Sequence, residues 1–443
     1  MKRHDVDPAA IGSPDEFRFV PAVTKENYLQ QYPPNMLLWH GDPAEAGTWS
    51  SSSGSTGRPT YWPRDILAQD DATELYARIF RQCFHAHRRS TLVIVGFAMG
   101  NWIGGTYTYS AMLALRRRGY KLSVIAPGIE VDTILDNIAT LGPLYDQVVV
   151  AGYPPFVKDL LDRANNEVLR QDLRLLLAGE AITEAWRDYV LDRIGEPRDS
   201  VSSCLVYGTA DAGIMGHETR TTIAIRRAAR SDDRLAEALL GPSEALPTFV
   251  EYDADYRFVE VDDQGRFLFT VDNSLPLVRY RINDVGHLIT PTELSETLLR
   301  TGHRLPVFTS TETCSFLALD RRTDVAASFY GLKIYPDSVH AALDDPVIAG
   351  WVTGKFILSP ASGADLQQTL HLRVELQPTK TPNADVEHRL RHAVVNALLR
   401  TNSEFARLHQ TLGHAAEPEI SLRAFGSPGF EVGVKHQWAE SAR

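Results

Sequence analysis

The sequence predicts an α/β protein. We expect a large N-terminal domain with mainly parallel sheets covered by helices plus a barrel-like β subdomain, and a small α+β C-terminal domain. Apolar strands alternate with amphipathic helices over the first two-thirds of the chain, a strand–turn–strand pattern follows Thr248, and a shorter mixed segment follows Asp324. Strand–helix alternation is typical of a parallel sheet with helices on both faces. Because 443 residues exceed one ordinary core, we expect two or three domains.

The alternating elements can be placed in order along the chain. In a helix expected over residues 65–88, Leu75, Ile79 and Cys83 recur at helical spacing. The short apolar run at residues 91–95 is typical of a buried strand. Further strands are expected at residues 122–126, 148–151, 173–177 and 204–207, and further helices at residues 106–118 and 182–194.

The pattern changes in the last third of the chain. Residues 256–261 and 266–271 have strand composition and flank a turn at residues 262–265, which is a good hairpin signal. After Asp324, strands are expected near residues 356–358 and 370–374. A helix is expected over residues 383–400, where one face carries Val386, Leu390, Val394 and Leu398.

Composition excludes several classes of function. Hydrophobic content of 44% and aromatic content of 9% are those of a soluble globular protein. The net charge of −11 lacks the basic footprint of a nucleic-acid-binding protein and opposes contact with anionic membranes. No apolar run is long enough to span a bilayer. Cys83, Cys204 and Cys314 are far apart and lack metal-binding spacing, so free thiols in a reducing cytoplasm are expected.

The most informative stretch of the chain is residues 50–59. Serine and threonine side chains surround Gly54 and Gly57, and the cationic Arg58 follows. Glycine lets backbone approach a ligand closely, successive N–H groups form an anion-binding concavity, and hydroxyls add donors. The stretch therefore predicts a phosphate-binding loop, but no Gly-Lys-Ser or Gly-Lys-Thr ends it as in a Walker loop. A flexible Ser/Gly linker is the alternative.

The loop and other segments occur in one order along the chain. They are residues 20–25 with 32–33, 52–59, 177–181, 207–211, 276–284, and 322–324 with 330–336. In this order they resemble the motifs of the adenylate-forming superfamily, which comprises acyl- and aryl-CoA ligases, adenylation domains and luciferases. The resemblance is greatest to the phenylacetate–CoA ligase branch and covers nearly the whole chain.

The resemblance implies an AMP-forming ligase that activates a carboxylic acid, aromatic or medium acyl, with Mg²⁺-ATP and transfers the acyl group to CoA. A carboxylate is a poor electrophile because its leaving group would be oxide, whereas the mixed anhydride with AMP has a good leaving group. Catalysis of this kind rests on positioning and electrostatics. The resemblance also implies an ATP- and acid-binding domain over residues 1–322 and a mobile lid domain over residues 323–443, with a hinge near Asp324.

The resemblance assigns an ATP site. Asp284 would bind the ribose, and Asp211, a hard oxygen ligand, would help to hold Mg²⁺. A surface turn is the alternative role for Asp284, and a helix N-cap is the alternative for Asp211. The remaining implied ATP- or AMP-binding residues are Ser52, Ser53, Gly54, Ser55, Thr56, Gly57, Arg58, Gly179, Glu180, Tyr207, Gly208 and Arg322.

The resemblance also assigns catalytic residues and an acid pocket. Arg322 would contact the ribose or the α-phosphate, and Lys435 the charge that develops during adenylation. Thr209, or a water, would supply the phosphate contact that a hydroxyl at position 210 makes in the superfamily. A surface lysine is the alternative for Lys435. The pocket would involve Phe97, Met99, Trp102 and Ala181, for which core packing is the alternative.

The chain departs from the superfamily pattern at several positions. They are Arg58 in place of Lys, Ala210 in place of a hydroxyl, Asn283 in place of Gly, Val325 in place of a second carboxylate, and Val434 between Gly433 and Lys435. These departures suggest a specialised enzyme and keep the acceptor open, because an amine or a carrier-protein thiol could replace CoA. No compact basic cluster marks a site for the ribose phosphate of CoA.

Two further readings come from other classes of protein. Ala210 favours a non-catalytic nucleotide-binding homologue, which the phosphate loop and the two aspartates, Asp211 and Asp284, oppose.

His217 beside Glu218 could form an acid–base pair, although a lone histidine is more often structural. A Rossmann dehydrogenase is excluded because no Gly-x-Gly-x-x-Gly turn follows a first strand. We expect no nucleic-acid or membrane partner, and a homodimer stays open.

Overall fold

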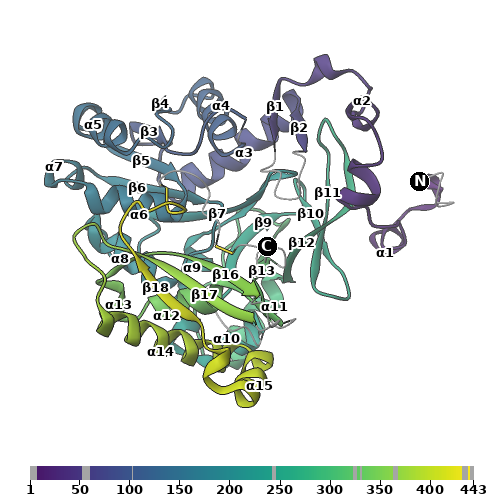
Figure 1. Cartoon of the computed structure of the whole chain (residues 1–443). Coiled ribbons are helices and arrows are strands. Elements are labelled where there is room, and N and C mark those ends of the chain that lie inside the picture. The colour runs from purple at the N-terminus through teal and green to yellow at the C-terminus, as the bar shows by residue number, and fades with distance from the viewer. Residues whose placement is uncertain are drawn as a thin grey trace.

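In the computed structural model, one long sheet runs through the molecule and a smaller sheet lies near the C-terminus (Figure 1). The structure describes residues 7–51, 60–101, 103–241, 246–322, 327–329, 332–362, 368–431 and 438–439. Strands β1 (Thr48–Ser51) and β2 (Tyr61–Arg64) form a separate antiparallel pair. The N-terminal helices are η2 (Pro8–Ala10), α1 (Pro14–Phe17), η3 (Lys25–Leu29), α2 (Pro34–Leu37) and η4 (Pro43–Glu45).

The predicted parallel sheet is confirmed. Its strands are β3 (Thr91–Val95), β4 (Leu122–Ile125), β5 (Gln147–Gly152), β6 (Leu173–Ala178) and β7 (Ser203–Thr209). The helices between or before them are α3 (Ile66–Gln82), α4 (Ile103–Arg117), α5 (Val131–Leu141), η5 (Gly142–Leu144), α6 (Pro154–Arg163), α7 (Asn166–Leu169) and α8 (Glu184–Arg193).

Both faces of the parallel strands are covered by helices. Along β3, Val93 and Val95 pack in the cluster that includes α3 and α4, whereas Leu92 and Ile94 pack in the cluster that includes α5 and α6. Successive strand residues point to opposite faces, so a strand buried on both sides is apolar throughout. The predicted helix at residues 65–88 ends earlier than expected, because the chain turns at His85 with a φ of 52°.

The second half of the long sheet is antiparallel. Its strands are β8 (Gly213–His217), β9 (Thr248–Asp253), β10 (Phe258–Val261), β11 (Arg266–Val271), β12 (Leu277–Ile289) and β13 (Cys314–Arg322), and its helices are α9 (Arg220–Ser231), α10 (Asp233–Leu240) and α11 (Pro291–Arg300). The strand order is β10-β11-β12-β13-β9-β8-β7-β6-β5-β3-β4. Val261 pairs with Phe267 across the predicted hairpin, which is therefore confirmed.

The antiparallel half curls, as the barrel-like prediction requires. The rings of Tyr207 on β7 and Phe267 on β11 lie 6.5 Å apart between centroids and share one hydrophobic core. The sheet order places β12, β13, β9 and β8 between these two strands. In a flat sheet, five strand spacings would separate them by about 24 Å. The barrel-like region is therefore continuous with the parallel strands.

The chain after the undescribed residues 323–326 has its own α+β arrangement and core, and we call residues 327–439 the C-terminal unit and residues 7–322 the large unit. The predicted buried face of α14, with Val386, Leu390, Val394 and Leu398, is confirmed. The elements are β14 (Ala327–Phe329), β15 (Leu332–Ile334), α12 (Pro336–Leu343), α13 (Pro346–Ala349), β16 (Val352–Ser362), β17 (Gln368–Leu376), α14 (Ala384–Thr401), α15 (Ser403–Leu412), η6 (Gly413–Ala416) and β18 (Glu419–Arg423).

Across the described ranges, no helix is both long enough and apolar enough to cross a membrane. The domain boundary at residues 322 and 323 stays a prediction, because Asp324 lies outside those ranges.

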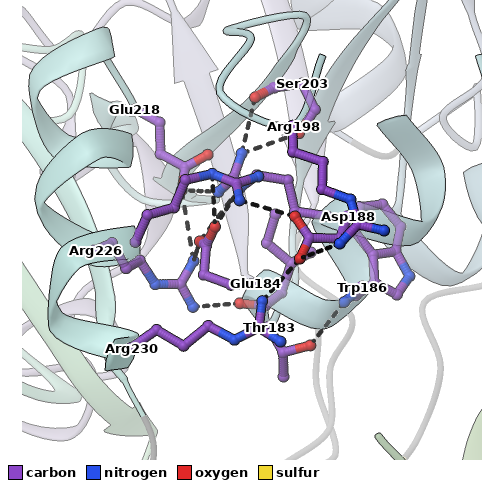
Figure 2. Close-up of polar contacts among 12 residues, drawn as sticks. Thr183, Glu184, Trp186, Asp188, Arg198, Ser203, Glu218, Arg226 and Arg230 are labelled. Carbon is purple, nitrogen blue, oxygen red and sulfur yellow. Dashed lines mark hydrogen bonds and ion pairs between the residues drawn. The ribbon is translucent and has the colours of Figure 1, made fainter. Parts of the chain in front are cut away.

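A buried ion network ties α8 and α9 to β7 (Figure 2). Arg187 is fully buried, contacts the carboxylates of Glu184 and Glu218, and donates to the Ser203 carbonyl at 2.9 Å. Arg226 reaches the same two carboxylates, at 3.2 and 3.6 Å. Burial lowers the pKa of Arg187, but the carboxylates outweigh this effect and raise that pKa, so the guanidinium stays charged.

Glu218→Ala is expected to lower the free energy of unfolding by about 3–5 kcal/mol, because it leaves the two buried guanidinium groups of Arg187 and Arg226 to share the one carboxylate of Glu184. Urea denaturation of the purified variant measures the change. The matched control is Asp192→Ala, which breaks the exposed ion pair between Asp192 and Arg198 and is expected to change stability far less. Equal losses of unfolding free energy in the two variants would show that the buried network contributes no more to stability than the exposed ion pair.

Candidate nucleotide and acid site

The candidate site lies where β6 and β7 end. Ala178 pairs with Val206, so the residues that follow both strands emerge at the same edge of the sheet. Gly179 and Glu180 follow β6, and a turn at residues 210–212 follows β7. Ligands of open α/β sheets bind outside the carboxyl ends of the strands. The Gly179–Ala181 and Tyr207–Asp211 segments therefore lie where a ligand would.

Tyr207 and Asp284, which the sequence places 77 residues apart, are in contact. The Tyr207 hydroxyl donates to Asp284 Oδ2 at 2.6 Å, and Asp284 is 5% exposed. Asp284 lies within β12 and pairs with Arg322 on β13. A buried strand position excludes the surface-turn alternative for Asp284. The backbone of Arg322 is therefore next to Asp284, as the predicted ribose site requires, although the Arg322 side chain is outside the described part of the structure.

Asp211 lies in the turn between β7 and β8. No helix begins there, since β8 starts at Gly213, so the helix N-cap alternative is excluded. Gly213 has a φ of +77°, and a Cβ there would lie 2.5 Å from the Tyr107 hydroxyl, so only glycine fits this close turn. Burial raises the pKa of Tyr280, and the adjacent Asp211 carboxylate raises it further by its charge and by accepting a hydrogen bond.

Thr209 stabilises the same turn. Its Oγ1 accepts a hydrogen bond from the Ala212 N–H at 3.0 Å. Because the hydroxyl is the acceptor in that bond, its own proton can still be donated to a phosphate oxygen. Gly208 leaves room for the turn, since a Cβ there would lie 2.9 Å from the Gly213 carbonyl oxygen. The turn thus presents a carboxylate and a hydroxyl at one place.

Sequence reasoning missed Arg64, which joins two of the predicted motifs. Its Nη2 donates to the Ala210 carbonyl at 2.7 Å and its Nη1 to Ser50 Oγ at 2.8 Å. The guanidinium is 4% exposed and lies 5.2 Å from the Tyr107 ring centroid. Burial lowers the pKa of Arg64, and the charge of the Asp211 carboxylate acts against that effect. An arginine in a short strand directly after the phosphate loop was the available signal.

The N-terminal motif contacts the motif at residues 276–284. Val23 N–H donates to the Arg279 carbonyl at 3.1 Å, and Arg281 N–H donates to the Val23 carbonyl at 2.8 Å. The Arg279 guanidinium contacts the carbonyls of Arg18 and Val20 and lies 2.9 Å from Glu260. The N-terminal segment is thereby bound to the strand that carries Asp284.

The predicted acid pocket is partly described. Phe97 is 2% exposed, and its ring lies 5.1 Å from that of Tyr153 in an edge-to-face contact. Met99 packs against the same core, and Ala181 is exposed. Gly179 has a φ of +91°, and a Cβ there would lie 2.8 Å from the Tyr153 ring. Core packing accounts for Phe97, and the roles of these residues toward an acid stay predictions.

Glu180 connects the site to the C-terminal unit. Its Oε2 accepts a hydrogen bond from Trp438 Nε1 at 3.1 Å. The Trp438 ring packs against His340 and Phe356, with centroid distances of 4.4 and 4.8 Å. The chain immediately after residues 432–437 is therefore anchored at Glu180.

Several predicted residues lie outside the described ranges. They are Ser52, Ser53, Gly54, Ser55, Thr56, Gly57, Arg58, Trp102, Asp324 and Lys435. The residues beside the predicted phosphate loop are described: Ser51 pairs with Tyr61, and Ser51 N–H donates to the Asn101 carbonyl at 2.8 Å. Lys435 is three residues before Trp438 in the sequence.

The donor set of the site fits Mg²⁺ brought with a nucleotide. In the described ranges no group of three or more His, Cys, Asp or Glu residues could hold a metal alone. Mg²⁺ in nucleotide sites is usually bound through one or two carboxylates together with substrate phosphates. Asp211 fits the first part of that set, and the phosphates would complete it.

His217 and Glu218 do not form an acid–base pair. His217 Nε2 lies 3.2 Å from Gln82 Oε1, whereas the Glu218 carboxylate contacts Arg187. Burial lowers the pKa of His217 to about 4, and the charge of Arg78 lowers it as well. The ring is therefore neutral at physiological pH and its role is structural.

Comparison of the sequence with protein-family models and with curated proteins found no match. Comparison of the structure with solved structures found several. 2-Hydroxyisobutyryl-CoA ligase in the postadenylation state, in complex with R3-HIB-AMP, superposes with a TM-score of 0.65 at 16% identity, covering 100% of this chain and 84% of that one. The same ligase with 2-HIB-AMP and CoA, in the thioesterification state, gives a TM-score of 0.51 with the same identity and coverage.

A second ligase agrees over a smaller part of its length. Anthranilate CoA ligase AuaEII, in complex with anthranoyl-AMP, superposes with a TM-score of 0.50 at 13% identity, covering 87% of this chain and 65% of that one. At these identities the likeness establishes the fold. The chain has the fold of these adenylate-forming ligases, in agreement with the resemblance of its motifs.

Proposed function

We propose that this chain is an AMP-forming ligase that activates a carboxylic acid with Mg²⁺-ATP and transfers the acyl group to CoA. The observation that carries the proposal is the meeting of two motif segments at the carboxyl edge of the sheet. Tyr207 contacts Asp284, and Asp211, four residues after Tyr207, contacts Tyr280, four residues before Asp284. The fold shared with CoA ligases supports the same proposal.

In the proposed first half-reaction, an oxygen of the acid's carboxylate bonds to the α-phosphorus of ATP. The bond from that phosphorus to the bridging oxygen breaks, and pyrophosphate leaves with the electron pair. Asp284 accepts hydrogen bonds from the ribose hydroxyls, and Thr209 donates to a phosphate oxygen. Asp211 would be the protein ligand of Mg²⁺, which would supply charge neutralisation at the phosphates. Lys435 would neutralise charge at the α-phosphate.

In the proposed second half-reaction, the acceptor attacks the acyl carbon of the adenylate. For CoA, the new bond is carbon–sulfur, the thiol proton is lost, and AMP leaves with the oxygen that came from the acid. An amine or a carrier-protein thiol would react in the same way: its nucleophilic atom bonds to the acyl carbon, it loses a proton, and AMP leaves. CoA is the first choice because both the 2-hydroxyisobutyryl and the anthranilate enzymes are CoA ligases. An aromatic or medium acyl acid is the proposed substrate class.

We further propose that the arrangement of the two units in this structure corresponds to adenylate formation. Support comes from Trp438, three residues after Lys435 in the sequence, which donates a hydrogen bond to Glu180 beside the candidate site. Agreement with the postadenylation structure of 2-hydroxyisobutyryl-CoA ligase, at a TM-score of 0.65, is better than with its thioesterification structure, at 0.51. The C-terminal unit would turn about the predicted hinge at Asp324 before transfer.

The test is acid-dependent release of pyrophosphate from Mg²⁺-ATP, over a panel of aromatic and aliphatic acids, with and without CoA. We expect release to rise with one class of acid and to turn over further with CoA. Release that ignores CoA would support the amine or carrier-protein alternatives. ATP binding without release for any acid would favour the non-catalytic homologue.

Lys435→Ala is expected to lower acid-dependent pyrophosphate exchange by on the order of a hundredfold, because a preorganised charge at the transition state is lost. ATP affinity, measured by calorimetry, should stay close to that of the wild type. Lys380→Ala is the matched control, since Lys380 is a lysine of the same unit that packs on Trp351, 4.7 Å from the ring centroid. Unchanged exchange in Lys435→Ala would assign the charge to another residue.

Arg64→Lys is expected to lower the adenylation kcat by about tenfold, because lysine cannot hold both Ser50 and Ala210 and one charged hydrogen bond is lost. The KM for Mg²⁺-ATP should change less, since Arg64 acts by positioning the loop and the turn. Arg257→Lys is the control, because buried Arg257 donates to the Ile214 carbonyl at 2.9 Å without touching β1. The same kinetic loss in both variants would reduce the Arg64 effect to general destabilisation.

A further inference from the structure

The two units meet through a buried lysine. Lys355 on β16 of the C-terminal unit contacts the Asp159 carboxylate on α6 of the large unit. Lys355 is 4% exposed and Asp159 is 3% exposed. Burying an ammonium group is costly unless it is paired. At this contact the charge of Lys355 is therefore stabilised by pairing with a carboxylate of the other unit.

Lys355 also has a carboxylate within its own unit. Glu375 on β17 is fully buried, and its Oε2 lies 3.8 Å from Lys355 Nζ. The Glu375 carboxylate is fixed by two donors of the C-terminal unit, Gly426 N–H at 2.8 Å and the Thr353 hydroxyl at 2.9 Å. Glu375 thus stays beside Lys355 whatever the position of the large unit.

The arrangement supplies one cation with two anions on different units. If the C-terminal unit turns away, Asp159 becomes hydrated and Lys355 keeps Glu375. Separation of the units then leaves no buried charge without a partner. An unpaired buried charge would make separation strongly unfavourable. The nearby charges on α6 do not compete for this lysine, because Lys158 pairs with Asp162 at 2.7 Å.

We propose that Lys355 is a positioning residue that holds the C-terminal unit against α6 during adenylate formation, and that Glu375 takes over as its partner during acyl transfer. This inference rests on the proposed function, because it assigns each carboxylate to one half-reaction. Asp159 favours the first arrangement, and Glu375 makes the second accessible.

The proposal predicts opposite effects of two substitutions on the two half-reactions. Asp159→Asn should slow acid-dependent pyrophosphate exchange into ATP by about tenfold, corresponding to a modest loss of pairing. It should leave transfer from a presynthesised acyl-adenylate to the acceptor unchanged. Glu375→Gln should leave the exchange intact and slow the transfer, because Lys355 then has Asp159 as its one carboxylate partner.

The matched control is Asp162→Asn. Asp162 is on the same helix and contacts Lys158 and Tyr189, both in the large unit. Asp162→Asn should leave the ratio of the rates of the two half-reactions unchanged. Equal losses in both half-reactions for Asp159→Asn would overturn the proposal. Equal losses in both half-reactions for Glu375→Gln would overturn it as well. A purely structural role would lower both rates together.

A measurement without catalysis separates this proposal from the proposed function. Hydrogen–deuterium exchange should increase in peptides covering α6 and β16 of Asp159→Asn, relative to the wild type and to Asp162→Asn. Unchanged exchange there would overturn the proposal even in an active ligase. If the wild type releases no pyrophosphate with any acid, the proposed function fails. The hydrogen–deuterium exchange result still decides whether Asp159 holds the units together.

Discussion

The candidate site depends on the closure of the antiparallel half of the sheet onto β7. The sheet order separates β7 from β12 by β8, β9 and β13, and four strand spacings in a flat sheet would amount to about 19 Å. The Tyr207–Asp284 hydrogen bond of 2.6 Å therefore exists only because the sheet curls. The shared core of Tyr207, Phe267 and Tyr280 stabilises that curl. The meeting of the two motif segments at the candidate site therefore depends on this packing.

Much of the fold could be predicted from the sequence, because β3 to β7 are mostly apolar and alternate with helices. Strand β12 could not, because its burial shows no two-residue period and its pairing with β13 shifts register after Val285. The motifs pointed to Tyr207 and Asp284 separately, but not to their contact. Arg64 was missed because its partner Ala210 is 146 residues away, a distance that no local pattern reports.

Two departures from the superfamily pattern have structural explanations. At Ala210 the backbone carbonyl receives Arg64, while the neighbouring Thr209 provides a hydroxyl. Asn283 replaces a glycine but lies within β12. In the described ranges, His85 and Arg279 are the non-glycine residues with positive φ, so Asn283 is not strained. Neither substitution requires the site to be distorted.

Buried ions serve two different purposes in this chain. All partners of Arg187 belong to the large unit, so its network can form once and stay closed. Lys355 has partners in both units, with Asp159 across the interface and Glu375 beside it. An apolar interface of the same size would favour one arrangement without offering a second. Under the proposed function, a charge with two alternative partners would keep both arrangements near in free energy, as two half-reactions on one ligase require.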